Sequence, residues 1–169
     1  MKISKDTKIG DVVPFLKEEH LKELLEKCEP VELDKPVITM TVGEFIKAAD
    51  DKYIMSFFND RNESLVKAVG RVKQFNKEMD NIAKVLKMNE IKPNPEELAA
   101  QRGVTFPSFG ESILCDCLEW FNLNSLDAAE NIPLSNYLIM KRKKSAEALY
   151  ERNLNKIYSD KNKKPKTGK

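Results

Sequence analysis

Cysteine and histidine, the side chains that most often bind metals or act as nucleophiles, are few and scattered in this sequence. His20 is the only histidine, and the cysteines are Cys28, Cys115 and Cys117. A structural zinc site needs about four such ligands, and residues 115 and 117 point to different faces of a helix. A Ser-His-Asp triad would depend on His20, with no nucleophile motif to support it. We therefore predict a protein that is not an enzyme, with no catalytic, cofactor-binding or metal-binding residues and no small-molecule substrate.

The segment ELAAQRGVTFPSFGESIL, residues 97–114, has a residue pattern like that of a DNA-binding helix-turn-helix. Its candidate reading helix, residues 108–122, has three acidic residues and no lysine or arginine. Neutralisation of phosphates supplies most of the affinity for DNA, so this face would repel the double helix. We interpret the segment as a packed helical corner, in which Leu98, Ala99, Val104 and Phe109 face inward.

Four consecutive cations, Lys141, Arg142, Lys143 and Lys144, would occupy a full turn of a helix. Such a turn has no uncharged side, so we expect it to leave the core and meet solvent, an acidic protein surface or nucleic acid. From Lys141 onward there are 11 Lys/Arg and 3 Asp/Glu, a balance of +8, whereas 18 and 24 precede it, a balance of −6. The sequence predicts an acidic body with a basic C-terminal arm.

The strongest helical pattern is an apolar seam with alternating spacings of three and four, formed by Leu65, Ala68, Val72, Phe75, Met79, Ile82 and Leu86. This is the heptad pattern of helices that pack along a shared line. Val69 and Ala83 widen the stripe, and we expect Gly70, Lys77 and Lys84 on the outer face. The pattern fits a helix inside a bundle or a seam with another chain, and both alternatives remain open.

Other helices are predicted from their start and stop signals. The first runs from about Val12 to Cys28, capped by Asp11, and the following residues 31–40 form an extended connector or at best an edge strand. Thr41 and Glu44 have the capping-box spacing that opens a helix with Phe45, Ile46, Ala49, Tyr53 and Phe57 inward.

Further along the chain, Asn94 and Pro95 begin a short helix that Gly103 ends, and Ser108 with Glu111 opens another. This second helix directs Ile113, Leu114, Cys117, Leu118 and Phe121 inward, and a short helical turn follows at residues 126–131. A last long helix runs from about Ser135 to Tyr158 and carries Ile139, Ala146, Leu149, Tyr150, Leu154 and Ile157.

These patterns predict an all-α fold, an irregular bundle of about five to six helices with a long central heptad-patterned helix and a long basic C-terminal helix. We divide the chain into an N-terminal helix and connector (1–40), a central helical bundle (41–131), a long C-terminal helix (132–158) and a basic tail (159–169) expected to be mobile in isolation. No apolar run approaches the roughly 18 residues of a membrane span, and no secretory signal is recognisable. With three cysteines, too few for a disulfide framework, a cytoplasmic protein is expected.

The segment from Phe109 to Ile157 resembles small helical assembly proteins of tailed bacteriophages. In these proteins an apolar helix with a single tryptophan, here Trp120, precedes a Leu…Ala-Glu…Pro-Leu turn and a long charged terminal helix. The resemblance covers the last third of the chain and carries over no site residues. It implies a non-catalytic virion component or a tail or head assembly factor, with further copies or virion proteins as partners. The alternative is a nucleic-acid-associated accessory or regulatory protein that uses Lys141–Lys144 and the tail.

Overall fold

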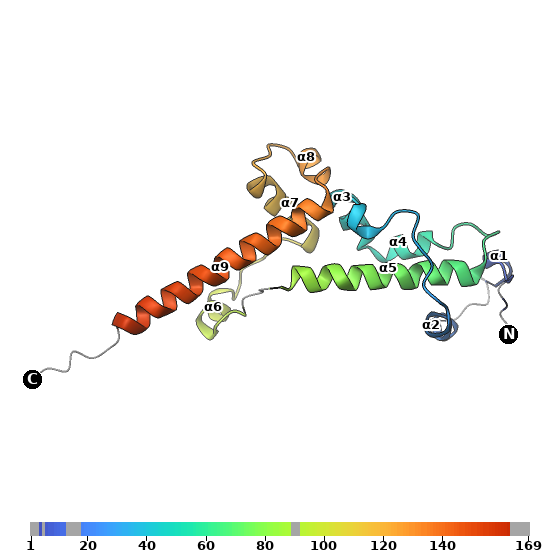
Figure 1. Cartoon of the computed structure of the whole chain (residues 1–169), viewed down its shortest axis with the longest axis horizontal. Coiled ribbons are helices and arrows are strands. Elements are labelled where there is room, and N and C mark those ends of the chain that lie inside the picture. Colours follow the sequence, from blue (N-terminus) through green and yellow to red (C-terminus); the bar gives the residue numbers. More distant parts are fainter. Residues whose placement is uncertain (1–3, 5, 13–17, 89–91, 163–169) are drawn as a thin grey trace, which may run out of the picture.

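The chain folds into α-helices arranged as an elongated body from which the last helix projects (Figure 1). This computed structural model describes residues 4, 6–12, 18–88 and 92–162. Nine α-helices and a short 3-10 helix form the regular structure of these ranges, which contain isolated bridges but no β-strand. The predicted all-α fold is confirmed, with more and shorter helices than expected.

The N-terminal helix differs from the prediction. Helix α1 spans Ile9–Val12 and α2 spans Glu18–Lys27. Asp11, the predicted cap, lies inside α1, and residues 13–17 fall outside the described ranges. The early start has a tertiary cause, because the amides of Ile9 and Gly10 donate to the carbonyls of Glu63 and Arg61, each at 2.9 Å.

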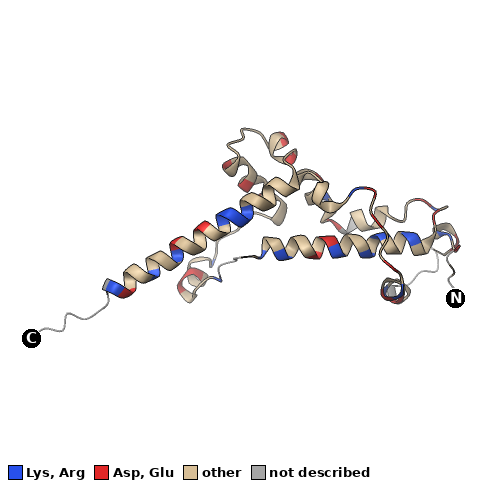
Figure 2. Ribbon diagram, viewed as in Figure 1, with Lys and Arg blue, Asp and Glu red and all other residues tan. Residues whose placement is uncertain are grey.

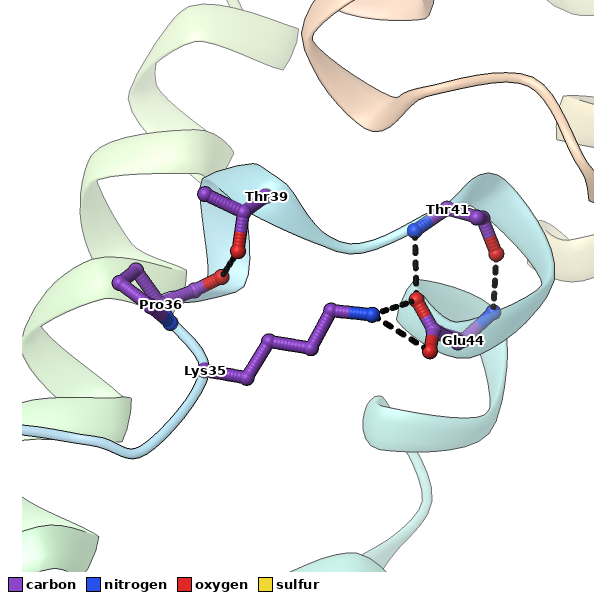
Figure 3. Close-up of polar contacts among 5 residues, drawn as sticks. All are labelled: Lys35, Pro36, Thr39, Thr41 and Glu44. Carbon is purple, nitrogen blue, oxygen red and sulfur yellow. Dashed lines mark hydrogen bonds and ion pairs between the residues drawn. The ribbon is translucent and has the colours of Figure 1, made fainter.

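The connector also departs from the extended prediction, since a 3-10 helix, η2, spans Val37–Thr39. The carbonyl of Pro36 closes this turn by accepting from the Thr39 hydroxyl at 2.7 Å (Figure 3). Glu78 anchors it to the central helix, because its carboxylate accepts from the Val37 amide at 2.7 Å. A contact far away in the sequence therefore gives the connector its conformation.

The predicted capping box at Thr41 and Glu44 is confirmed and opens α3, Val42–Ala48. Each side chain accepts from the other's backbone amide, and the ammonium of Lys35 donates to both Glu44 oxygens at 2.6 Å (Figure 3). The helix ends at Ala48 and a separate α4 spans Asp51–Ser56, so the single helix predicted through Phe57 is wrong. Ala49, expected inward, is exposed.

Helix α5, Leu65–Leu86, is the long central helix that the heptad pattern predicts. Lys77 and Lys84 are exposed as expected, but Gly70 is buried. A Cβ atom on Gly70 would lie 2.5 Å from Val31 Cγ2 and 2.7 Å from the Glu29 carbonyl oxygen. The prediction of an outer-face Gly70 is wrong because the chain after α2 crosses the helix at this point.

The C-terminal helices begin where their caps predict. Helix α6 spans Pro95–Ala100 and α7 spans Phe109–Trp120, both opened by capping boxes. Helix α8 spans Leu126–Glu130, and α9, with 29 residues, spans Leu134–Asn162. Helix α9 is thus longer than predicted, and residues 163–169 of the predicted tail lie outside the described ranges.

Two apolar clusters hold these helices together, and α5 contributes to both. The smaller cluster joins α1, α2 and the first turns of α5 around Ile9, Val12, Cys28, Leu65, Ala68 and Val69. The larger joins α3, α5, α7, α8 and α9, and its buried members include Phe45, Phe75, Ile82, Ile113, Cys117, Leu134 and Tyr137. The start of α9 is therefore part of the core.

Candidate functional site

The predicted seam on α5 faces the interior of its own chain. Leu65, Val72, Phe75 and Ile82 are each at most 5% exposed. Tyr53 packs on Phe75 with ring centroids 5.1 Å apart. These seam residues stabilise the fold, and the expected contact with another chain stays a prediction for the two half-buried positions, Met79 and Leu86.

Met79 and Leu86 line an open groove of about 340 Å³. Phe45, Phe109 and Ile113 are among its other apolar lining residues, and its polar lining includes Asp116 and two cations, Lys87 and Lys141. Helices α3, α5, α7 and α9 all supply lining residues, so the groove follows from packing that sequence patterns do not specify.

Lys141, the first of the four predicted arm cations, is bound within the chain. Its ammonium lies 3.1 Å from Asp116 Oδ2 and 5.4 Å from the centre of the Trp120 ring. The same carboxylate oxygen accepts from the Tyr137 hydroxyl at 3.1 Å, and Tyr137 stacks on Trp120. The prediction that the whole cationic turn lies outside the core is therefore wrong for Lys141, because α7 supplies both an acid and an aromatic face.

The buried groups beside Asp116 resist ionisation. Burial, together with the Asp116 charge and hydrogen bond, raises the pKa of the Tyr137 hydroxyl well above its ordinary range. Burial, with a smaller contribution from Asp116, raises the pKa of the Cys117 thiol to about 11. Both side chains are therefore protonated and neutral near pH 7.

Arg142, Lys143 and Lys144 are exposed on the next turn of α9. Glu147 partly compensates two of them, since its carboxylate lies 3.8 Å from the Lys143 ammonium and 3.6 Å from that of Lys144. Exposed ion pairs of this kind contribute little to stability. Arg142, Lys143 and Lys144 therefore contribute little to holding the fold together.

An exposed apolar line on α9 was not identified from the sequence, which predicted its residues only as apolar positions of the last helix. Ile139, Tyr150 and Ile157 are 66%, 66% and 51% exposed. They are eleven and seven residues apart, close to three and two full turns, so they point in nearly one direction. The buried residues Leu134, Tyr137 and Leu138 occupy the opposite side. We call Ile139, Tyr150 and Ile157 the outward stripe. The sequence feature that could have revealed it is the position of these residues on the side of the helix away from Leu134, Tyr137 and Leu138, the core positions at its start.

The C-terminal part of α9 projects past the body (Figure 1). We call residues 145–161 the arm. Arg152 connects the arm to the body, because it donates to the Lys92 carbonyl at 3.0 Å and lies 3.6 Å from the Glu97 carboxylate. Helix α6, which carries Glu97, has no buried residue. Elsewhere on the arm, Tyr150, Ile157 and Tyr158 are each more than half exposed.

Helices α7 and α8 carry acidic residues and no lysine or arginine of their own (Figure 2). Residues 103–140 contain five Asp/Glu and no Lys/Arg, whereas residues 141–161 contain seven Lys/Arg and three Asp/Glu. Glu111, Glu119 and Asp127 are exposed on this pair of helices, and Leu126 between them is 56% exposed. We call the exposed side chains of α7 and α8 the acidic surface.

The segment between α6 and α7 is not the packed corner that we expected. Leu98, Val104 and Phe109 are all more than half exposed, and Ala99 is exposed too. Phe109 keeps one edge contact with Phe45, at a centroid distance of 6.2 Å. The interpretation failed because capping boxes determine where both helices start but not whether their apolar residues find a partner.

The remaining chemistry-bearing residues lie apart from one another. Cys117 is buried and Cys115 is exposed, as predicted, and His20 is half-buried on α2. Within the described ranges, no three His, Cys, Asp or Glu side chains converge on a position for a metal ion. None of the helices in these ranges is both long and apolar enough to span a membrane.

Comparison with known proteins finds no relative of this chain. No family model, no curated protein and no solved structure matches the chain.

Proposed function

We propose that this chain is a non-catalytic interaction protein that assembles with other proteins through the outward stripe of α9. The observation that carries the proposal is the alignment of three large apolar side chains, each more than half exposed, on the side of α9 opposite its buried residues. Scattered exposed apolar residues are ordinary, but a row of them at helical spacing fits the mode in which an amphipathic helix lies on an apolar surface.

The resemblance to small assembly proteins of tailed bacteriophages suggests the setting, and we extend the proposal to a virion component or a tail or head assembly factor. Such a role needs helical contact surfaces and no reacting groups. The exposed residues of α9 agree with that requirement, because they include the outward stripe and the cations Arg142, Lys143 and Lys144.

The alternative function, contact with nucleic acid, is supported by the exposure of Arg142, Lys143 and Lys144. Phosphate contacts would use these cations, while Glu147 and Glu151 on the same helix would oppose them. The two functions differ in what touches Tyr150, which is a protein surface in the first and a nucleotide in the second.

A photo-crosslinking amino acid at Tyr150, in cells that produce the full chain, tests the proposal. We expect covalent adducts of defined mass with a protein, and none from the same amino acid at Asn155, which is exposed on the other side of α9. No adduct at Tyr150, or an adduct that nuclease shortens, would contradict the proposal, and the second result would support the nucleic-acid alternative.

A further inference from the structure

The groove of about 340 Å³ lies open between α5 and α7. Met79 and Leu86 line it from α5, and Phe109 and Ile113 line it from α7. Because Met79 and Leu86 are seven residues apart on one helix, about 10 Å, the apolar wall extends over two helical turns. An apolar segment that covered this wall would remove apolar surface from water, which is favourable.

The chain itself joins the two walls of the groove. It leaves the α5 wall at Lys87 and returns to the α7 wall at Phe109, and both residues line the groove. The point of return is fixed, because the Ser112 hydroxyl donates to the Pro107 carbonyl at 3.3 Å and Ser112 is itself a lining residue. The segment that ends at Pro107 therefore meets the groove at its rim.

This segment carries apolar side chains that are exposed in its present position. Residues 95–109 are all exposed, and α6 within them has no buried residue. Leu98, Val104 and Phe106 are 51%, 53% and 61% exposed. A segment with so few buried contacts belongs to the part of a structure that opens and rearranges most easily.

Val104 and Phe106 are the side chains best placed to reach the groove. Phe106 precedes a proline, which favours an extended backbone at this residue. Side chains two residues apart in an extended segment share a face, so Val104 and Phe106 then form one apolar face. Phe106 directly precedes the fixed Pro107, and Val104 lies within about 10 Å of it along the chain.

The contact that holds the segment in its present position is weak. Arg152 on α9 donates to the Lys92 carbonyl at 3.0 Å and lies 3.6 Å from the Glu97 carboxylate, and the two side chains of this ion pair are 37% and 48% exposed. Exposed ion pairs of this kind contribute little to stability. Little free energy therefore opposes release of the segment from α9.

We infer that residues 92–106 are a lid that closes over the groove and places Val104 and Phe106 on its apolar wall. The structure shows the open position. The lid contains two Lys/Arg and two Asp/Glu, so charge does not select it. The covalent connection does, because a tethered segment meets its site at an effective concentration of about millimolar order.

The lid gives the groove two states. In the open position the groove presents apolar surface to other proteins, and in the closed position the lid hides it from them. This regulation concerns a surface of α5 and α7, so it goes beyond the proposed function of the outward stripe and does not depend on it.

Disulfide formation in a glutathione buffer measures how often the lid reaches the groove. Val104→Cys with Met79→Cys places one thiol on the lid and one in the groove, and Cys115→Ser removes the exposed native thiol from every variant. Val104→Cys with Lys77→Cys is the matched control, because Lys77 is exposed on the other side of α5. Circular dichroism confirms that each variant is folded, and mass spectrometry of proteolytic fragments quantifies the disulfide within the chain.

We expect the effective concentration of the lid and groove thiols to exceed that of the control pair by about tenfold or more. Phe106→Ser removes the largest apolar side chain of the lid and should lower this value. Arg152→Met releases the lid from α9 and should raise it. Ile157→Ser, which removes an exposed apolar side chain from α9 instead, should leave it unchanged.

Equal effective concentrations for the two thiol pairs would overturn the inference, and so would an unchanged value in Phe106→Ser. Disulfides that form only between chains would also overturn it, because a second copy would then cover the groove. None of these results depends on what a crosslinker at Tyr150 captures, so the proposed function is decided separately.

Discussion

At the scale of single residues, Asp116 joins α7 to α9 through one oxygen atom. Asp116 Oδ2 accepts from the Tyr137 hydroxyl and from the Lys141 ammonium, each at 3.1 Å. Charge-assisted hydrogen bonds in a partly buried setting are stronger than their exposed counterparts. The four cations look alike in the sequence, but only Lys141 binds Asp116 and helps to hold α7 and α9 together. Arg142, Lys143 and Lys144 are exposed on the surface.

A first prediction concerns the pH dependence that Glu44 contributes. The hydrogen bond from Lys35, followed by that from the Thr41 amide, lowers the pKa of Glu44 below its ordinary value of 4.5. A carboxylate with a depressed folded-state pKa contributes stability above its unfolded pKa and loses it as the pH falls through the folded value. We expect Lys35→Met to raise the Glu44 pKa and to reduce the loss of stability below about pH 4.5.

The Glu44 pKa is measured by an NMR titration of its side-chain carboxyl carbon, and the stability by urea unfolding on both sides of the transition. Lys77→Met, which removes an exposed cation from α5, is the control and should leave the Glu44 titration unchanged. An identical Glu44 pKa in the unaltered chain and in Lys35→Met would refute the assigned role of Lys35.

At the scale of elements, the helix starts were predictable because their signals are local. The pairs Thr41–Glu44 and Ser108–Glu111 form capping boxes, and Asn94 with Pro95 opens α6 as expected. Each needs only residues within one turn. The continuous seam of α5 was equally visible, since a 22-residue helix with one apolar side repeats its signal several times.

Contacts between distant segments could not be predicted in this way. The burial of Gly70 depends on the path of residues 29–31, and the connector becomes η2 through Glu78. The same periodicity that marks an apolar side of α9 does not say whether that side meets the body or a partner. Tyr150 and Ile157 were therefore predicted only as apolar positions of the last helix, and the structure shows that the body covers the side with Leu134 and Tyr137.

A second prediction tests whether Gly70 is exposed on the outer face of α5, as the sequence predicts, or buried against residues 29–31, as in the structure. On an exposed helical face, Gly70→Ala would stabilise the chain by about 1 kcal/mol through higher helix propensity. At the crossing with residues 29–31, the new methyl group overlaps the Glu29 carbonyl oxygen, and overpacking costs about 1–3 kcal/mol. We expect a net loss in the free energy of unfolding, measured by urea denaturation.

The sign of the change is the informative quantity. Lys77→Ala, at an exposed position of the same helix, provides the reference and should stay within about 0.5 kcal/mol of the unaltered chain. A gain in stability for Gly70→Ala would mean that the segment after α2 does not pack on α5.

At the scale of the whole molecule, the chain consists of a body with two apolar clusters and a helix that leaves it. Helix α9 serves both parts: Leu134, Tyr137 and Leu138 are buried, and the arm is not. A single helix thus transmits any load on the arm directly into the larger cluster, with no flexible joint between residues 134 and 161.

A third prediction separates these two roles of α9 by truncation. A chain ending at Lys144 loses the arm and its Arg152–Glu97 contact, which is largely exposed, so we expect the free energy of unfolding to fall by no more than about 2 kcal/mol. A chain ending at Asn131 also loses three buried side chains of the core, and we expect it to be unfolded at room temperature.

Circular dichroism and thermal melting measure the folding of both truncated chains, and each truncated chain serves as the control for the other. If the chain ending at Lys144 were unfolded, the arm would be part of the core. If the chain ending at Asn131 melted cooperatively near the unaltered temperature, α9 would not belong to the larger cluster.

The stacking of Trp120 on Tyr137, beneath the Lys141 ammonium, has a practical consequence. Trp120 is the only tryptophan of the chain, so its fluorescence reports on the α7–α9 contact and does not report on the cluster around α1 and α2. Emission followed beside far-ultraviolet dichroism would therefore reveal whether the two halves of this molecule melt as one cooperative unit or as two.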